Sequence, residues 1–522
     1  AAAAALAQRL DRLAERGAGD APELEDLVAE WLRFSGPLPV SELASAFGLG
    51  DAELAAVLDA LGAARTAVVD ELSLGAAGPE VCDAENLEIL LRWLRSDLRP
   101  AFEARPAAEL PLFLAHHQGL TDRGDGLDGL QDALERLFGV PLPAALWEGE
   151  VLPARLRPYY PSWLDASLQQ SELVWLGCGT GKVTFGFESD LELFVEAPDG
   201  GAAEEGKDDA ESPGAGAVLA ALGDRSSALT PGELAAAAGL GTPALHDAIW
   251  PLAWGGAVTN ETWLVMRQGL ASGFQSPEPP SRRPPTARRG RRRGWRASPA
   301  AAGGRWRRVD AGHADLDALE REELVKDRAR LLIARYGVVF RELLARERKP
   351  FAWSRVFRTL RLMELSGEVL AGYFFHGVRG LQFMAHGAFR DLSNGLPQDA
   401  IYWLCAADPA SMAGVDIEGL KGQLPARRPS NHLVYRGHEL VLISKRRGRE
   451  LEIRVDPEHA RLPDLLGPLE NMLAREVDPA ASIPVETING DPAAQSPYAR
   501  RLDGLFRTVR EGQVLRLWKR YR

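Results

Sequence analysis

A glycine-rich stretch that contains a lysine, GCGTGKV at residues 177–183, is the part of the chain closest to a nucleotide-binding loop. Such a loop follows the pattern GxxxxGK with Ser or Thr next, because backbone amides wrap the phosphates, the lysine meets them and the hydroxyl holds magnesium. Here the spacing is one residue short, and Val183 stands where the hydroxyl is needed. A strand rather than a helix is expected to follow Lys182. We interpret the stretch as a hairpin turn and predict no nucleotide-binding site and no ATP hydrolysis in this chain.

Metal and disulfide chemistry is not predicted either. The three cysteines, Cys82, Cys178 and Cys405, lie far apart, and the nine histidines form no CxxC or HxxxH pairing. Zinc sites and disulfide frameworks require such ligand spacing. The sequence therefore predicts no metal and no cofactor bound to this chain.

Arginines recur at helical spacing within residues 352–365. A 3.6-residue period places three apolar side chains on one stripe: Val356, Leu360 and Met363. The opposite side carries three basic ones: Arg355, Arg358 and Arg361. A helix with one buried and one basic face is typical of the recognition helix that winged-helix proteins place in the DNA major groove. The alternative, that the arginines form only a solvated helix face, stays open for this helix taken alone.

Two further basic segments are candidates for phosphate contacts. After Gly367, the runs EVLAGYFF and LQFMA flank the turn HGVRG and predict a β-hairpin wing that carries Arg379. Near the C-terminus, a second hairpin has a basic tip with Arg446, Arg447 and Arg449. Together with the helix, these residues make up the predicted DNA-binding set.

The basic helix must be positioned by a larger array of similar modules. We predict an α+β protein of tandem winged-helix modules followed by a C-terminal β-barrel-like domain. The predicted segments are an entering helix (1–22), winged helix 1 (23–96), a winged-helix-like module 2 with a long hairpin (97–210), winged helix 3 (211–271), a disordered Arg-rich linker (272–309), winged helix 4 (310–395) and a β-barrel module (396–522).

An internal repeat supports the modular prediction. Residues 41–61 align without gaps on residues 232–252, and both copies keep a Gly-Leu-Gly turn. Recurrence of a two-helix unit followed by short strands indicates tandem copies of one supersecondary module. Chance similarity between helices rich in Ala and Leu is the alternative.

Charge is distributed unevenly along the chain. The total is −12, yet residues 1–271 hold 17 Lys and Arg against 43 Asp and Glu, residues 272–309 hold 11 against 1, and residues 310–522 hold 33 against 29. A polyanion is therefore expected to meet the C-terminal half. With 46% hydrophobic residues and no long apolar run, the chain is expected to be a cytoplasmic protein without a membrane span. Its first residues begin within a helical pattern, and we expect a piece of a longer protein.

Several phrases in this order resemble the large helicase-related (Lhr) DNA helicases, in the region that follows their helicase core. These phrases are LHDAIWPLAWGGAVTNET at 245–262, GRW at 304–306, ARYGVVFRELL at 334–344, FRTLRLMELSGEVLAGYFFHGVRGLQF at 357–383, and ETINGDP followed by SPYARRL at 486–502. LPARL at 152–156 adds a weaker likeness upstream.

The resemblance implies tandem winged helices ending in a β-barrel, homo-oligomerisation, and a part in DNA repair. It places a 3′-to-5′ ATP-driven helicase core before residue 1, so that ATP and Mg would bind only there. Expected partners are DNA, that core and further copies of the chain. We predict a DNA-binding and assembly region.

The resemblance also implies a similarity to AlkZ-type DNA glycosylases, which excise damaged or crosslinked bases. Those enzymes carry a Gln-apolar-Gln or Gln-apolar-Asp triplet, and this sequence has none. The best remaining polar cluster is Glu486, Asn489 and Asp491, although Asn489 and Gly490 are also typical of a tight turn between strands. Whether the chain is an enzyme stays open, with excision of damaged, uracil or crosslinked bases as one alternative and a pure assembly scaffold as another.

Overall fold

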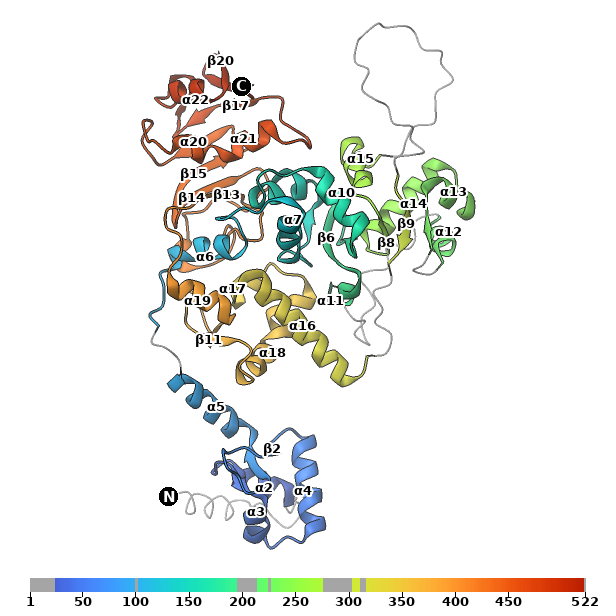
Figure 1. The fold of residues 1–522 in the computed structure, drawn as a ribbon, viewed down its shortest axis with the longest axis vertical. Coiled ribbons are helices and arrows are strands. Elements are labelled where there is room, and N and C mark those ends of the chain that lie inside the picture. Colours follow the sequence, from blue (N-terminus) through green and yellow to red (C-terminus); the bar gives the residue numbers. More distant parts are fainter. Residues whose placement is uncertain are drawn as a thin grey trace, which may run out of the picture. The chain divides into compact units, whose positions relative to one another are not determined.

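The structure, a computed structural model, divides into two compact units, residues 1–102 and 103–522 (Figure 1). It describes residues 24–98, 102–194, 214–223, 227–275, 303–309 and 316–520. The predicted entering helix at 1–22 lies outside the described residues, as does most of the predicted linker.

The first unit is a winged helix with its own core. Its elements are α2 (Leu24–Leu32), β1 (Leu38–Pro39), α3 (Val40–Phe47), α4 (Asp51–Ala63), β2 (Ala67–Asp70), β3 (Glu80–Asp83) and α5 (Ala84–Leu98). The strands form an antiparallel sheet in the order β1-β3-β2. Buried Val28, Leu43, Val57 and Val81 come from three helices and the central strand, and they form the core of this unit.

The second winged helix begins the larger unit. It contains η1 (Ala107–Glu109), α6 (Leu110–His117), α7 (Gly126–Glu135), β4 (Leu142–Pro143), α8 (Ala144–Leu146), the π-helix η2 (Trp147–Val151), α9 (Leu152–Arg155), α10 (Pro161–Gln170), β5 (Leu173–Gly177), β6 (Lys182–Phe187), η3 (Glu188–Asp190) and α11 (Leu191–Phe194). The strand order is β4-β6-β5. The stretch at 177–183 is the β5–β6 hairpin turn, where Gly177 pairs with Val183, so the interpretation as a turn is confirmed.

The third winged helix shows where the predicted linker boundary is wrong. Its elements are α12 (Ala215–Leu222), β7 (Ala228–Leu229), α13 (Pro231–Ala238), α14 (Thr242–Trp254), β8 (Val258–Asn260), α15 (Leu264–Ser272) and β9 (Trp306–Arg308). Strand β9 pairs with both β7 and β8, and Trp306 is buried. Residues 306–308 therefore belong to the sheet of this module. The Arg-rich segment is an insertion within the module, because β9, which follows it in the sequence, pairs with both of the strands that precede it.

The fourth winged helix contains the predicted basic helix. Its elements are α16 (Ala318–Tyr336), β10 (Val338–Val339), α17 (Arg341–Leu344), η5 (Lys349–Phe351), α18 (Trp353–Leu365), β11 (Leu370–Gly372), β12 (Gln382–Met384) and α19 (His386–Asn394). The strand order β10-β12-β11 repeats that of the first three modules. The internal repeat also has a structural basis, since Gly48 and Gly239 end α3 and α13 with φ of +65° and +66°, where a side chain would be strained.

The C-terminal domain is built mainly of strands. Its elements are β13 (Ile401–Cys405), η6 (Glu418–Leu420), β14 (His432–Arg436), β15 (Glu439–Lys445), β16 (Glu450–Ile453), α20 (Leu462–Leu465), α21 (Gly467–Ala474), β17 (Ile483–Val485), β18 (Thr487–Ile488), β19 (Asp491–Pro492), η7 (Ala493–Gln495), α22 (Ala499–Leu505), β20 (Arg507–Glu511) and β21 (Val514–Trp518). They form a six-stranded sheet, β13-β14-β15-β16-β18-β19, and a three-stranded sheet, β17-β21-β20. Neither order closes on itself among the described residues, and a barrel stays a prediction.

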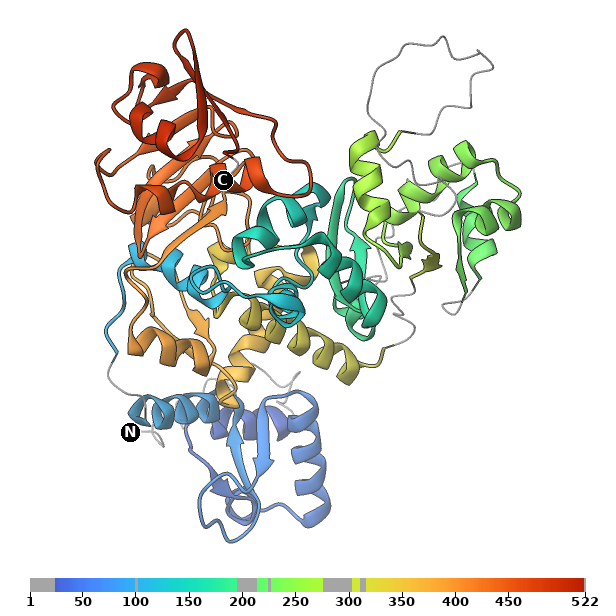
Figure 2. The ribbon, with the colours of Figure 1, turned by 45° about the horizontal axis from the view of Figure 1, so that its top comes forward.

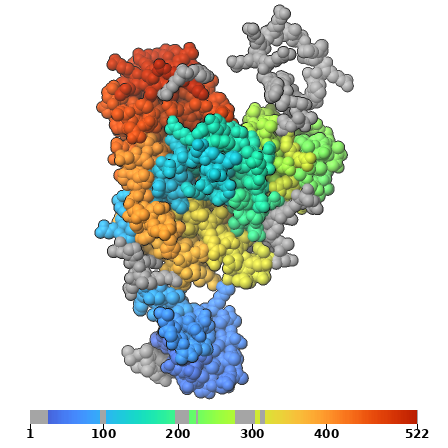
Figure 3. Space-filling model, in the orientation of Figure 1, coloured from blue at the N-terminus to red at the C-terminus, as the bar shows by residue number. Residues whose placement is uncertain are grey.

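The second module lies at the centre of the larger unit. Figures 2 and 3 show it, in cyan and teal, between the third module in green and the C-terminal domain in orange and red. Strand β5 contacts β8 of the third module, while η2 and α9 contact β13. Trp175 on β5 meets Trp263 and Trp306 edge-on at 6.2 and 6.1 Å, which joins the two cores. Within the described residues no helix has the length and apolar character of a membrane span.

Candidate nucleic-acid interface

Helix α18 is held on its module by an apolar stripe. Val356 and Leu360 are fully buried and Met363 is almost so, as the 3.6-residue period predicted. On the adjoining side, the Phe357 ring lies 5.0 Å from Trp353 and 6.1 Å from Phe383 on the central strand β12. These aromatic contacts fix the rotation of the helix about its axis, so that one face is presented outward.

The outward face of α18 carries the predicted arginines. Arg355 and Arg358 are exposed and Arg361 is half-buried, while Leu362 beside them is 54% exposed. A row of guanidinium groups with an exposed apolar side chain suits a surface that contacts both phosphates and bases. The structure thus brings all three predicted helix arginines to the same module face.

Comparison of the four winged helices sets α18 apart. The helix immediately before the strand pair is α4 in the first module, α10 in the second, α14 in the third and α18 in the fourth. The sequences of α4, α10 and α14 contain no Lys or Arg, and α4 exposes Asp51, Glu53 and Asp59 instead. Of these four equivalent helices, α18 is therefore the one whose charge suits DNA.

The fourth wing, residues 373–381, is partly covered by the second module. The backbone N–H of Arg105 donates to the carbonyl of Phe374 at 2.8 Å, and the His376 N–H donates back to the carbonyl of Arg105 at 2.8 Å. Phe375 packs on Phe113 with ring centres 5.4 Å apart. Consequently the wing is a contact between modules as well as a surface feature.

Arg379 is exposed on that wing and faces an existing ion pair. Asp416 lies 3.0 Å from Lys421. Lys421 is the main cause of the lowered pKa of Asp416, and the charge of Arg379 lowers this pKa further. The charge of Arg379 therefore acts partly on a carboxylate of the protein, which weakens its attraction for a phosphate.

The basic tip of the β15–β16 hairpin is largely neutralised by carboxylates. Arg446 lies 2.7 Å from Glu450 and 3.1 Å from Glu486, and Arg449 lies 3.1 Å from Glu486. Arg447 is exposed and forms no ion pair within the part of the chain that the structure describes. Gly448 packs against α21, and Figure 1 places α21 and α18 at opposite ends of the larger unit. The structure does not bring the tip and α18 together.

The predicted polar cluster contains side chains with different roles. Asn489 and Gly490, with φ of +54° and +89°, form the tight turn between β18 and β19. The Asn489 amide accepts from the Ile453 N–H at 2.7 Å and donates to the Ile453 carbonyl at 2.8 Å, so it braces β16. Glu486 binds Arg446 and Arg449, while Asp491 is exposed. A turn explains Asn489 without any catalytic role.

Two cavities in the larger unit do not involve that cluster. One, of about 140 Å³, lies between α7, α10 and β6, and its lining residues, which include Gln131, Gln170 and Phe187, contain no carboxylate. The other, of about 340 Å³, is lined by Asp190, Glu192 and neighbouring residues of α11 and α16. Among the described ranges, no group of three His, Cys, Asp or Glu side chains is placed to hold a metal ion.

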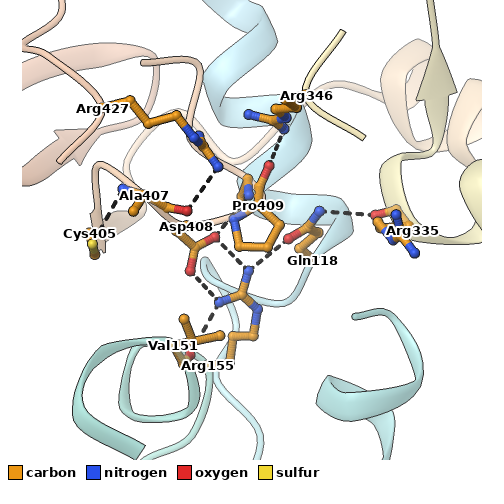
Figure 4. A network of polar contacts seen from close by, with 11 residues as sticks. Gln118, Val151, Arg155, Arg335, Arg346, Cys405, Ala407, Asp408, Pro409 and Arg427 are labelled. Carbon is orange, nitrogen blue, oxygen red and sulfur yellow. Dashed lines mark hydrogen bonds and ion pairs between the residues drawn. The ribbon is translucent and has the colours of Figure 1, made fainter. Parts of the chain in front are cut away.

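A buried polar network, which the sequence analysis missed, joins three parts of the larger unit (Figure 4). Arg155 at the end of α9 makes a two-pronged contact with Asp408 at 2.7 and 2.8 Å, and both side chains are at most 1% exposed. Gln118 accepts from Arg155 at 2.7 Å and donates to the Arg335 carbonyl at 3.0 Å. The available signal was an arginine inside the otherwise apolar phrase LPARL.

The network extends into the fourth module and thereby orients α18. Arg335 lies 2.9 Å from Glu347. Burial raises the pKa of Glu347, but the charges of Arg335 and Arg346 and the hydrogen bonds from Tyr336 and Arg335 together outweigh it, and the pKa is lowered overall. Arg346 donates to the carbonyls of Ser411, at 2.6 Å, and Pro409, in the loop that also holds Asp408. Because α16 contacts α18, this loop fixes the basic helix relative to the second module.

The π-helix η2 is the second link between parts. Glu148 accepts from Arg267 of α15 at 2.8 and 2.9 Å and from the Tyr159 hydroxyl at 2.7 Å. Glu150 contacts His432 and Arg475, each at 3.0 Å. Both carboxylates are buried and paired, so they are suited to holding modules together rather than to proton transfer.

These observations define the class of protein: a tandem winged-helix protein with one basic recognition-type helix and a C-terminal β domain. Residues 106–187 and 318–403 each match a family model described as "Large helicase-related protein, winged-helix domain". These two segments are thus similar to winged-helix domains of large helicase-related proteins, and the chain resembles the C-terminal region of that family.

Named relatives match most of this chain. A protein of Mycolicibacterium smegmatis called "Lhr helicase/ probable uracil glycosylase" is 29% identical over 516 residues, covering 92% of this chain and 33% of its own length. "Lhr helicase/uracil glycosylase" of Escherichia coli is 28% identical, covering 77% of this chain and 26% of its own length. The chain thus spans about a third or less of these curated relatives.

A solved structure also aligns with the chain. Streptomyces sahachiroi DNA glycosylase AlkZ covers 71% of this chain and is itself covered to 97%, with 13% identity and a TM-score of 0.43. Similarity at that level does not define a common fold.

Proposed function

We propose that this chain is the DNA-binding and assembly region of an ATP-dependent 3′-to-5′ DNA repair helicase, and that α18 contacts the DNA. The observation that carries the proposal is the exposed arginine face of α18, which its three sister helices lack. The matches to winged-helix domains of helicase-related proteins support a role on DNA. ATP and Mg would bind to the helicase core and not to this chain.

The test is DNA binding by the triple variant Arg355→Ala, Arg358→Ala and Arg361→Ala. We expect the affinity for duplex DNA to fall on the order of 10- to 100-fold, and the slope of log K against log salt to flatten by about 2 to 3, because each lost phosphate contact contributes about 0.9. An electrophoretic shift assay over a salt series measures both quantities.

The matched control removes three other arginines at the surface, Arg436, Arg454 and Arg461, each of which forms an ion pair with a carboxylate. It loses the same net charge and should bind normally. Equal binding by both triple variants would contradict a role for α18. A wild-type chain with no affinity for DNA at low salt would instead favour the pure scaffold.

The assembly part of the proposal rests on α5 of the first unit. Ile89, Leu90, Trp93 and Leu94 are exposed, and Trp93 is 66% exposed. Leu90, Trp93 and Leu94 follow Ile89 by one, four and five residues, and this spacing places all four side chains on one side of the helix. An apolar helix side of this kind suits contact with another copy of the chain or with the helicase core.

Excision of uracil or of damaged or crosslinked bases is the second candidate function. It is favoured by the names of the two relatives, and the candidate residues in this chain are Glu486, Asn489 and Asp491. If the chain is a glycosylase and this cluster is its site, Asp491→Asn and Glu486→Gln should abolish abasic-site formation on uracil-containing duplexes. Asp399→Asn, an exposed aspartate elsewhere in the domain, is the control. Full activity in both cluster variants would exclude the cluster.

A further inference from the structure

Two arginines of the second winged helix, Arg123 and Arg157, lie on neighbouring segments of the chain, and Arg157 comes four residues before the start of α10. The loop containing Arg123 is joined to the segment containing Arg157 by two backbone hydrogen bonds, from the Gly124 N–H to the Arg155 carbonyl at 2.9 Å and from the Arg157 N–H to the Gly124 carbonyl at 3.0 Å. Gly124 also lies so close to Gly129 of α7 that a β-carbon on either would come within 3.1 Å of the other's backbone. The backbone of the loop that carries Arg123 is therefore held next to the backbone of the segment that carries Arg157.

The charges of this arginine pair are not balanced by a bound carboxylate. Within the described ranges, neither guanidinium has a hydrogen bond or an ion pair, and Arg157 is exposed while Arg123 is half-buried. Burial and the nearby charge of Arg157 lower the pKa of Arg123, and Glu470 opposes this only in part. Two neighbouring arginines whose repulsion is offset only in part by a carboxylate are suited to binding an anion, because an anion would relieve the remaining repulsion.

An exposed aromatic ring follows the arginine pair along the chain. Tyr160 immediately precedes α10, is 43% exposed, and meets Trp163 edge-on with ring centres 5.2 Å apart. The neighbouring Tyr159, in contrast, is used internally, since its hydroxyl donates to Glu148. A ring supported at its edge and open to solvent is suited to stacking on a nucleobase.

The charge of α10 indicates whether duplex or single-stranded DNA would bind next to this helix. The helix has no Lys or Arg, and its Asp165 is paired with Arg267 at 2.8 Å, so it lacks the charge for insertion into a major groove. Stacking on Tyr160 requires a base that is not already stacked in a duplex. Both features favour single-stranded DNA at this place.

We propose that Arg123, Arg157 and Tyr160 form a second DNA site, in which the two guanidinium groups bind phosphates of a single strand and the Tyr160 ring stacks on one of its bases. The inference rests on the proposed function. It adds to that function a binding site for a single strand that leaves the duplex bound by α18.

The test measures fluorescence anisotropy of the whole chain with a short oligothymidylate and, separately, with a blunt duplex. Arg123→Gln with Arg157→Gln should weaken oligothymidylate binding about 10-fold and flatten its salt slope by about 1.4, since each phosphate on a single strand contributes about 0.7. Tyr160→Leu should weaken it by a similar factor, whereas Tyr160→Phe keeps the ring and should bind as wild type. Blunt-duplex affinity should stay within about twofold in all of these variants, because the arginines of α18 are intact.

Arg123→Lys with Arg157→Lys retains both charges and separates loss of charge from loss of fold, and Arg436→Gln with Arg461→Gln is the matched control. Equal loss in the Gln and Lys double variants, or unchanged oligothymidylate binding and salt slope in the Gln variant, would overturn this inference. If the α18 triple variant still loses duplex binding in that case, the proposed function stands. If the wild-type chain binds neither DNA, both fail.

Discussion

Asp408→Ala is expected to lower the unfolding free energy of the unit formed by residues 103–522 by about 3–5 kcal/mol. The substitution would leave the Arg155 guanidinium buried without its carboxylate, and its Nε already lacks a partner in the described residues. It would also remove the acceptor that receives the Ala410 N–H at 2.8 Å, so the loop that Arg346 contacts would loosen. Removing one partner of a buried ion pair costs far more than the net stabilisation by the pair, because the remaining charge has no water.

Calorimetry and denaturant unfolding, monitored by the tryptophans, can measure this change. Asp399→Ala removes an exposed carboxylate, 88% exposed, from a surface pair and should change stability by less than about 1 kcal/mol. The double variant Arg155→Met with Asp408→Leu should recover most of the loss, because two apolar side chains leave no buried charge. A single Asp408→Ala variant as stable as wild type would contradict the role assigned to the network.

Gly177→Ala is expected to be the other strongly destabilising change, by about 3 kcal/mol or more. A β-carbon at this position would lie 1.9 Å from the Ala253 carbonyl oxygen and 2.7 Å from that of Trp254. These are backbone atoms at the end of α14, and they cannot rotate away as a side chain could. The glycine of the nucleotide-loop-like stretch therefore permits the second and third modules to approach each other.

Gly216→Ala is the matched control, since its β-carbon would meet nothing within 4 Å and it lies in helix α12, where alanine is favoured. Near-ultraviolet circular dichroism should report a changed environment of Trp175, Trp263 and Trp306 in the Gly177 variant and none in the control. An unaltered spectrum and an unaltered melting temperature for Gly177→Ala would show that the two modules do not depend on this contact.

Local patterns were sufficient for the individual modules. The 3.6-residue stripe of α18, the Gly-Leu-Gly turns at 48–50 and 239–241, and the Asn489–Gly490 turn each correspond to the predicted element. These features depend on residues a few positions apart, whose backbone preferences and side-chain directions are set within one or two turns of chain. The winged-helix order of the fourth module followed directly from them.

The sequence by itself determined that the chain has repeated winged-helix modules, a strand-rich C-terminal domain and one basic helix in its fourth module. Tertiary structure decided what lies across long separations: β9 closes a sheet on β7 and β8, and Glu486 neutralises Arg446 and Arg449. It also decided that Arg155 pairs with Asp408, 253 residues away. Charge counts cannot reveal these outcomes, because whether an arginine is available to DNA depends on which carboxylate the fold brings within about 4 Å of it.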